Sequence, residues 1–373
     1  MRLLAFVFSV SALFFSCGSV ENKSKYGEIV FHLPDSGYVS LKTRVSSTRE
    51  EIVVFNSDDR VVLREAGEGV YSVPVFGGSI HGQWDGGGLF KGVWVDSLRY
   101  SNYRIPLEIR PVVAGASCVE KRTSFKYNTS LGLLIGECFC DSVVGTILTP
   151  TGDYRYLTGV KSNKDLRLNT FDGAHLFSFT ATIEGDSLLN GVFLSGKHYT
   201  EEWEGVRVDS SEPSWPSSQK SSPDQGLSFL GISPVKLLDS LNKKLLVVDV
   251  LGTWCPNCYD EVSLIKSLKE RYEDVLFLSV AFERGDSVSA LKRIERFKKE
   301  IGVSWGVLYG GVASKKQAET ILPFLGGVKS FPTTAFISLD GEVVVHTGFN
   351  GPATPLYQEE VVFYENTING FIE

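Results

Sequence analysis

Residues 247–258 read Val-Val-Asp-Val-Leu-Gly-Thr-Trp-Cys-Pro-Asn-Cys, and this stretch decides the fold of the C-terminal part of the chain. Its first half belongs to an apolar run over residues 245–250, which predicts a buried strand. Its second half begins a predicted helix over residues 256–271, because proline is favoured at the first helical position, where the backbone N–H has no partner. A buried strand that leads directly into a helix is typical of an α/β sheet.

The rest of residues 227–373 continues the alternation of strands and helices. Strands are predicted at 275–281 and 305–308, and helices at 288–301, 315–325 and 356–372. Two further strands, 334–338 and 343–346, flank Asp340-Gly341, which is a hairpin signal. We therefore expect an α/β sheet with one antiparallel edge.

Cys255 and Cys258 are the residues of this stretch that carry chemistry. A cysteine at a helix N-terminus faces unpaired N–H groups and the positive end of the helix dipole, which favour the thiolate. Such positions lower the cysteine pKa from ~8.5 to roughly 3.5–7.5, so we expect Cys255 to be the nucleophile. Cys258 lies on the same helix face and can attack Cys255 to resolve a mixed disulfide. A zinc site is the alternative, but residues 227–373 offer only His346 as a further Cys or His ligand.

The stretch 247–258 resembles the redox motif of the thioredoxin superfamily, and most closely that of its membrane-tethered extracytoplasmic branch, the TlpA/ResA-like thioredoxins. Residues 330–334, Ser-Phe-Pro-Thr-Thr, resemble the cis-proline loop of the same family. The resemblance implies a thioredoxin-like fold, a cis bond before Pro332 and a Phe331 backbone offered to an extended substrate. It also implies that no organic cofactor is needed, because the dithiol is the redox group. The implied substrate-binding residues are Trp254, Pro256, Phe331 and Pro332.

Two acidic residues stand close to the cysteines in the sequence. Asp249 interrupts an apolar strand, where a lone buried carboxylate is costly and calls for a purpose. Glu261 follows Cys258 by one helical turn, and the resemblance places such a glutamate near the buried thiol. Either acid could take the proton from Cys258, and burial would raise its pKa toward neutrality. We expect the pair to share one proton, with a structural Asp249 and a solvated Glu261 as the alternatives.

The N-terminus reads as a targeting segment. Arg2 precedes an apolar run over residues 3–15, which is shorter than the roughly 20 residues of a membrane-spanning helix. Cys17 ends this run and resembles the lipidated cysteine of bacterial lipoproteins, with an ordinary secretory signal as the alternative. We therefore expect a signal peptide over residues 1–16, a lipidated Cys17 with a tether over 17–26, and an extracytoplasmic, membrane-anchored location.

The region between the tether and the α/β part differs in composition. Residues 27–209 show short stretches of alternating apolar and polar residues separated by glycine-rich turns, as in residues 39–45. This pattern predicts an all-β domain, a sandwich or an open barrel. Residues 210–226 are rich in Ser and Pro and predict a linker.

The remaining candidates carry weaker signals. Cys118, Cys138 and Cys140 are an odd count in the β-rich region, so Cys118 could pair with either of the others and leave a thiol free. None of the five histidines has the spacing of metal ligands, and we predict no metal site. The net charge of -7 argues against nucleic acid as a partner.

These observations predict a thiol–disulfide oxidoreductase that forms a mixed disulfide with protein substrates at Cys255. The resemblance implies the reducing direction, with electrons from a membrane-embedded thiol donor and apocytochrome c as one candidate client. A disulfide oxidant or isomerase is an alternative, because direction follows the reduction potential. A thiol peroxidase is another, although only Trp254 separates Thr253 from Cys255, which does not fit that group. A lipid-anchored binding module with an accessory thioredoxin domain is the alternative from a different class.

Overall fold

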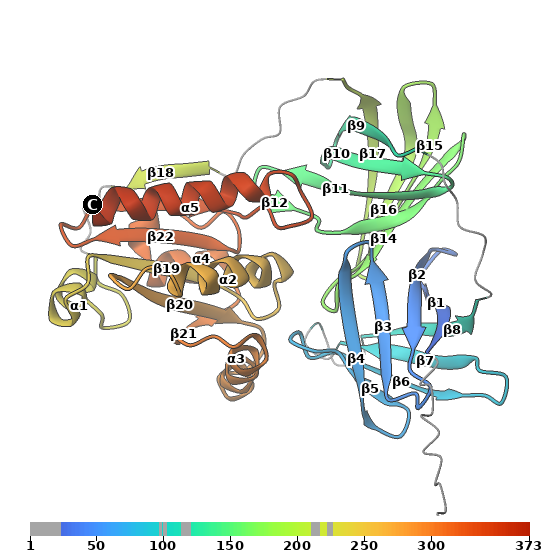
Figure 1. The fold of residues 1–373 in the computed structure, drawn as a ribbon, viewed down its shortest axis with the longest axis horizontal. Coiled ribbons are helices and arrows are strands. Elements are labelled where there is room, and N and C mark those ends of the chain that lie inside the picture. Colours follow the sequence, from blue (N-terminus) through green and yellow to red (C-terminus); the bar gives the residue numbers. More distant parts are fainter. Residues whose placement is uncertain (1–23, 97–98, 100–102, 113–120, 210–216, 222–226) are drawn as a thin grey trace, which may run out of the picture.

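The protein is described here by a computed structural model that covers residues 24–96, 99, 103–112, 121–209, 217–221 and 227–373. The predicted signal peptide and the predicted lipidation at Cys17 lie outside the described residues. Figure 1 shows two all-β units beside one α/β unit. Within the described part of the chain, no helix is long and apolar enough to cross a membrane.

The first unit is a closed antiparallel barrel, which we call the first barrel. It closes because β1 pairs with both β2 and β8, so that Ile29 lies opposite Leu41 and Ile109. Alternate side chains point inward and form a core that includes Phe31 and Trp94. The strands are β1 (Lys25–His32), β2 (Tyr38–Val45), β3 (Glu51–Asn56), β4 (Asp59–Gly67), β5 (Val70–Ser72), β6 (Ser79–Trp84), β7 (Phe90–Val95) and β8 (Arg104–Pro111).

The second unit, the second barrel, is a nine-stranded sheet in the order β10-β9-β17-β16-β15-β14-β13-β11-β12. A further pairing of β10 with β11 closes the sheet into a ring and leaves β12 as a short branch. Its core holds the stacked rings of Phe179 and Phe193, whose centroids lie 4.4 Å apart. The strands are β9 (Thr123–Thr129), β10 (Gly132–Phe139), β11 (Ser142–Thr149), β12 (Gly152–Asp153), β13 (Leu157–Lys161), β14 (Asp165–Phe171), β15 (Leu176–Glu184), β16 (Ser187–Ser195) and β17 (Tyr199–Arg207).

The β-rich region therefore differs from the sandwich or open barrel that the sequence predicts, since it contains two closed barrels. Alternation along a strand reports which face is buried, but it does not report which strands pair at the ends of a sheet. The barrels pack together through Phe171 of β14, which joins the core of the first barrel. The buried Asn56 accepts the Phe171 N–H at 3.0 Å and donates to the Phe171 carbonyl at 2.8 Å. The two barrels thus share part of one core.

The third unit is the α/β sheet that the sequence predicts for residues 227–373, with strand order β18-β23-β22-β19-β20-β21. β19, β20 and β21 are parallel, whereas β22 runs antiparallel to β19 and to β23. The strands are β18 (Ser217–Ser221), β19 (Leu245–Leu251), β20 (Val275–Glu283), β21 (Gly306–Val312), β22 (Thr333–Ser338) and β23 (Val343–Thr347). The helices are α1 (Pro234–Leu241), α2 (Pro256–Lys269), α3 (Ser287–Ile301), α4 (Lys315–Ile321) and α5 (Tyr357–Ile372).

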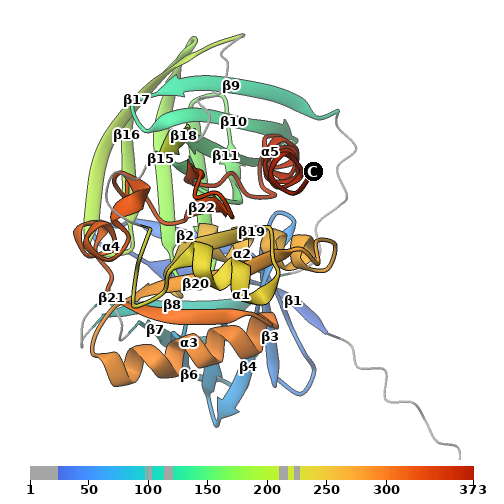
Figure 2. The same cartoon turned by 90° about the vertical axis from the view of Figure 1, so that its left-hand side faces the viewer.

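Helices cover both faces of this sheet. Side chains of α2, α3 and α5 pack with Val247 on one face, and side chains of α1 and α4 pack with Val248 on the other. Figure 2 shows α4 and α5 on opposite sides of β22. Every residue of β19 is buried, which explains its continuous apolar run and makes Asp249 exceptional. This central strand leads directly to the two cysteines.

Part of the predicted linker belongs to the sheet. Residues 217–221 form β18, which pairs antiparallel with β23. The strand is polar, Ser-Ser-Gln-Lys-Ser, and no pattern of buried side chains announces it in the sequence. Lys220 also forms an ion pair with Glu342, with Nζ and Oε1 2.6 Å apart. The chain therefore pairs with the edge of the sheet before it enters the α/β unit.

Candidate active site

The first turn of α2 presents the two cysteines. Cys255 caps the helix with extended backbone angles, and Pro256 takes the first helical position. Cys255 and Cys258 form a disulfide, with their Cα atoms 5.2 Å apart. The Cys258 N–H donates to Cys255 Sγ at 3.2 Å. Cys258 is fully buried, whereas Cys255 keeps 6% of its surface exposed, so Cys255 is the more accessible cysteine of the pair.

The loop before β22 lies against this disulfide. The bond between Phe331 and Pro332 is cis, as the sequence predicts. The Phe331 carbonyl oxygen lies 3.6 Å from Cys255 Sγ. Trp254 and Phe331 pack edge to face with ring centroids 5.6 Å apart, and the Trp254 indole N–H donates to the Phe282 carbonyl at 2.9 Å. The predicted substrate-binding residues are thus brought together around Cys255.

Asp249 and Glu261 are both buried beneath the helix, and each carboxyl influences the ionisation of the other. Ser279 Oγ donates to Asp249 Oδ2 at 2.9 Å, and the Trp305 indole N–H donates to Ser279 Oγ at 2.8 Å. Burial raises the pKa of Asp249 to about 6. Burial and the neighbouring Asp249 carboxylate raise the pKa of Glu261 well above its usual range.

The sharing of one proton by Asp249 and Glu261 stays a prediction. Glu261 Oε1 accepts from Thr334 Oγ1 at 2.7 Å and from the Tyr364 hydroxyl. The Asp249 charge makes ionisation of Glu261 unfavourable, because two buried carboxylates at close range repel each other. Glu261 is fully buried, so the alternative of a solvated helix residue is wrong.

Glu283 is a functional candidate that the sequence analysis missed. This buried residue at the end of β20 accepts hydrogen bonds from Thr253 N (2.7 Å) and Thr253 Oγ1 (2.9 Å). The Arg293 guanidinium pairs with it at 3.1 Å. Burial raises the pKa of Glu283, and Thr253 and Arg293 stabilise its charged form. Glu283 therefore fixes the backbone at Thr253, two residues before Cys255. Its position directly after an apolar strand was the sequence signal that could have identified it.

The second barrel reaches the start of α2, which the sequence does not predict. The Asn257 amide, between the two cysteines, donates to the Asp153 carbonyl at 3.0 Å. Arg155 forms a bidentate ion pair with Asp260, with Nε–Oδ2 at 2.7 Å and Nη2–Oδ1 at 2.9 Å. Figure 1 shows β11 and β12 extending toward the loop that precedes α5.

The cysteines of the second barrel are not part of this site. Cys138 is a free thiol, and burial raises its pKa, which makes it a poor nucleophile. Cys140 is disulfide-bonded. Cys118 lies outside the described residues.

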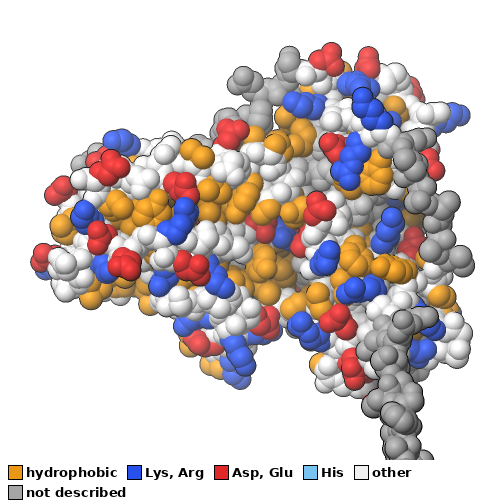
Figure 3. Space-filling view, viewed as in Figure 1, with side chains coloured by type: hydrophobic (Ala, Val, Ile, Leu, Met, Phe, Trp, Pro, Cys, Tyr) orange, Lys and Arg blue, Asp and Glu red, His pale blue; other side chains and the backbone are white. Residues whose placement is uncertain are grey.

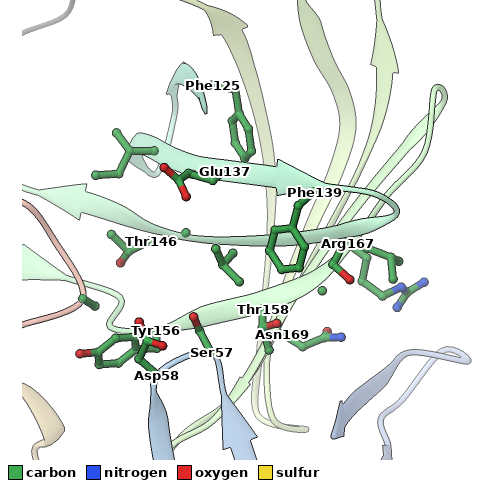
Figure 4. A pocket seen from close by; sticks show the side chains of 18 of the residues that line it. Ser57, Asp58, Phe125, Glu137, Phe139, Thr146, Tyr156, Thr158, Arg167 and Asn169 are labelled. Carbon is green, nitrogen blue, oxygen red and sulfur yellow. The ribbon is translucent and has the colours of Figure 1, made fainter. Parts of the chain in front are cut away.

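A separate cavity of about 920 Å³ lies between the two barrels and residues 352–356. Figure 4 shows its wall of β10, β11, β13 and β14 side chains facing the turn that carries Asp58. Thr146 Oγ1 and Asn169 Oδ1 are buried in this wall and have no hydrogen-bond partner among the described residues. The described residues that line the cavity include neither cysteine of the disulfide, so it is a second candidate site.

One face of the molecule carries mixed charge. Figure 3 shows Lys and Arg side chains interspersed with Asp and Glu over all three units on this face.

Comparison with known proteins finds similarity to structures of thioredoxin-family proteins over about a third of the chain. A thiol:disulfide interchange protein of Chlorobium tepidum is 19% identical, with a TM-score of 0.27, over 36% of this chain and 84% of its own. The thioredoxin domain of a Bacteroides vulgatus thiol-disulfide oxidoreductase is 18% identical, with a TM-score of 0.25, over 40% and 94%. A thioredoxin-related protein of Neisseria meningitidis is 21% identical, with a TM-score of 0.25, over 35% and 90%.

No family model and no curated protein matches the chain. At such low identity and TM-score, the solved structures do not define what this chain does. Its function has to be inferred from the geometry of the dithiol.

Proposed function

We propose that the chain is an extracytoplasmic thiol–disulfide oxidoreductase that reduces disulfides in other proteins. The observation that supports this most is the Cys255–Cys258 disulfide at the N-terminus of α2. Its more exposed sulfur lies beside the Phe331 carbonyl, where an extended substrate could pair with the backbone. The thioredoxin-like character that the sequence motifs imply agrees with this arrangement.

The reaction starts from the reduced pair. The Cys255 thiolate attacks one sulfur of a substrate disulfide, so a mixed disulfide forms and a substrate thiolate leaves. The helix N-terminus stabilises the attacking thiolate, because the Cys258 N–H points at Cys255 Sγ. Cys258 then attacks Cys255 Sγ, which releases the second substrate thiolate and leaves the Cys255–Cys258 disulfide. The substrate gains two electrons, and the enzyme loses two.

The acid pair supplies the base for the second step. Cys258 is buried and must lose its proton before it attacks. Burial raises the pKa of Asp249 to about 6, so its carboxylate is ionised at neutral pH and can serve as the base for that proton. The fully buried pair thus keeps the proton inside the protein during resolution.

A membrane-embedded thiol donor would return two electrons to the enzyme, and a lipidated Cys17 would hold the enzyme near that donor. Apocytochrome c remains one candidate client. An oxidant or isomerase would use the same residues in the opposite direction. The reduction potential of the couple separates these functions, because a tenfold change in equilibrium corresponds to about 30 mV.

Turnover of a protein disulfide by the full chain, with a dithiol as reductant, tests the proposal. We expect Cys255→Ser to abolish turnover and Cys258→Ser to accumulate a mixed disulfide that mass spectrometry detects. Cys138→Ser is the matched control and should retain full activity, because this thiol lies in the second barrel. Turnover that survives Cys255→Ser would show that the reaction uses another residue. Faster turnover of peroxide than of disulfide would instead make the chain a peroxidase.

A binding function of the barrels is the second candidate, and the cavity between them favours it. In that case the barrels would select the client, and the dithiol would act on it. Thr158→Trp would fill the cavity from β13. We expect this variant to lose discrimination between protein substrates while it reduces a small disulfide at the normal rate. Unchanged discrimination would count against a recruiting cavity.

A further inference from the structure

The strongest feature outside the dithiol is the segment of the second barrel that touches the start of α2. We call residues 151–155 the hairpin clamp, because they follow β11, include β12 and end at Arg155. Gly152 of the clamp forms a parallel bridge with Phe349 of the α/β unit. The Asp153 side chain accepts the Gly351 N–H at 2.6 Å.

The clamp contacts the α2 start inside the redox motif itself. Asn257 lies between the cysteines, and its amide donates to the carbonyls of Asp153 (3.0 Å) and Phe349 (3.4 Å). Asp260, two residues after Cys258, forms the bidentate pair with Arg155. The first turn of α2 is therefore bound by the second barrel on both sides of Cys258.

The close approach between the hairpin clamp and the α/β unit requires glycine at two positions. Gly152 has φ +129°, and a Cβ there would lie 2.7 Å from the Phe349 oxygen and 3.0 Å from the Asn257 amide nitrogen. A Cβ on Gly351 would lie 2.6 Å from Asp260 Oδ2. A larger side chain at Gly152 would force the clamp away from Phe349 and Asn257, and one at Gly351 would displace the Asp260 carboxylate that Arg155 binds.

Arg155 joins all three units. Its guanidinium lies 3.5 Å from Asp59 of the first barrel and 3.9 Å from Asp172 of the second, in addition to Asp260. The residue is buried and adopts a left-handed backbone with φ 55°, which costs energy for any side chain other than glycine. Strain of this kind persists where the surroundings hold a residue for a purpose.

We propose that the hairpin clamp, through Asp153 and Arg155 as positioning residues, binds the α2 start more tightly in the disulfide form than in the dithiol form. The clamp thereby makes the Cys255–Cys258 couple a stronger reductant. The inference rests on the proposed function, since it concerns the same dithiol. Coupling of this kind is reciprocal, so tighter binding of the oxidised form favours oxidation of the couple to the same extent.

One physical reason gives the coupling its sign. Reduction breaks the S–S bond, adds two electrons, and lets the sulfurs on either side of Asn257 move apart, which disturbs the bound turn.

The test uses the full chain equilibrated with reduced and oxidised dithiothreitol, with the reduced fraction measured by alkylation and mass spectrometry. Gly152→Ala and Arg155→Gln both loosen the clamp from the second barrel. We expect each to raise the equilibrium constant for reduction about tenfold, which corresponds to about 30 mV. Arg296→Ala is the matched control, because Arg296 binds the first barrel at Val75 O (3.0 Å) from α3, away from the redox motif. The control should stay within twofold of the unmodified protein.

Equilibrium constants that are unchanged in both folded clamp variants would overturn the proposal. If the variants do not fold, hydrogen exchange on the unmodified protein decides. We expect faster exchange of residues 151–155 in the reduced form, and equal rates in both forms would overturn the proposal. Failure of the proposed function is distinct, because the clamp variants would then still differ from the unmodified protein in their equilibrium constant for reduction, although none of them would turn over protein disulfides.

Discussion

Replacing Asp249 with Asn should make the protein more stable and its chemistry slower. Burial raises the pKa of Asp249 to about 6, whereas its ordinary value is 3.8. Between these pH values the folded protein keeps a proton that the unfolded chain releases, so the free energy of unfolding falls as pH rises through this window. A difference of about 2 pKa units corresponds to about 3 kcal/mol at pH 7. Asn avoids this penalty and can still accept the Ser279 hydrogen bond.

We therefore expect Asp249→Asn to raise the free energy of unfolding by about 3 kcal/mol at pH 7, and to reduce the fall between pH 4 and 6, of which Glu261 keeps its own share. The measurement is unfolding in urea, with hydrogen exchange of β19 and α2 as the readout. This readout excludes signals from the barrels. Asp274→Asn is the matched control, because Asp274 is exposed and its change should stay within about 0.5 kcal/mol. The same Asp249 variant should resolve the mixed disulfide about a hundredfold more slowly, since it lacks the base.

A flat pH dependence in the unmodified protein would refute this reasoning. It would mean that Asp249 ionises in the folded state as easily as in water. Equal stability of variant and parent at pH 7 would lead to the same conclusion. Slower resolution without a gain in stability would show that the carboxylate serves chemistry at no cost to the fold.

Three other substitutions test the surroundings of the site. Tyr364→Phe removes a hydrogen bond that lowers the Glu261 pKa, so the pH profile of mixed-disulfide resolution should move to higher pH. An unchanged pH profile would show that the protonation state of Glu261 does not control resolution of the mixed disulfide. Glu283→Gln leaves Arg293 buried beside a neutral group and should cost about 3 kcal/mol in urea unfolding, compared with under 0.5 for the exposed Glu273→Gln. Phe297→Ala opens a cavity in the α/β core and should cost about 4 kcal/mol, measured in the same way.

The α/β unit was predictable because its signals are local. The apolar run of β19, the proline after Cys255 and the hairpin at Asp340-Gly341 each report the structure of their own segment. Asp249 was predictable as a special residue for the same reason, since it is the one charged residue in an apolar strand. A feature can be predicted from the sequence when the residues that form it and the pattern that indicates it lie in the same short segment.

The clamp could not be predicted, because its meaning depends on contacts between distant segments. Arg155 lies in Asp-Tyr-Arg-Tyr, which reads as an ordinary polar turn, and its partner Asp260 is more than a hundred residues away. Asn257 reads as a neutral spacer between two cysteines until its amide is seen to bind Asp153. Closure of the barrels escaped prediction in the same way, since the pairing of β1 with β8 leaves no pattern in either strand.

The polar strand β18 has a consequence for how the α/β unit behaves alone. An unpaired strand at the edge of a sheet offers a row of N–H and C=O groups to any other extended chain. β18 occupies that row on β23, and its Lys220 adds charge at the outer edge. A fragment that begins at residue 226 would lack β18 and uncover β23, whose Val343 and Val345 are buried core residues. Such a fragment would expose an unpaired edge strand and should self-associate. β18, which lies in the predicted linker, therefore protects the sheet from self-association.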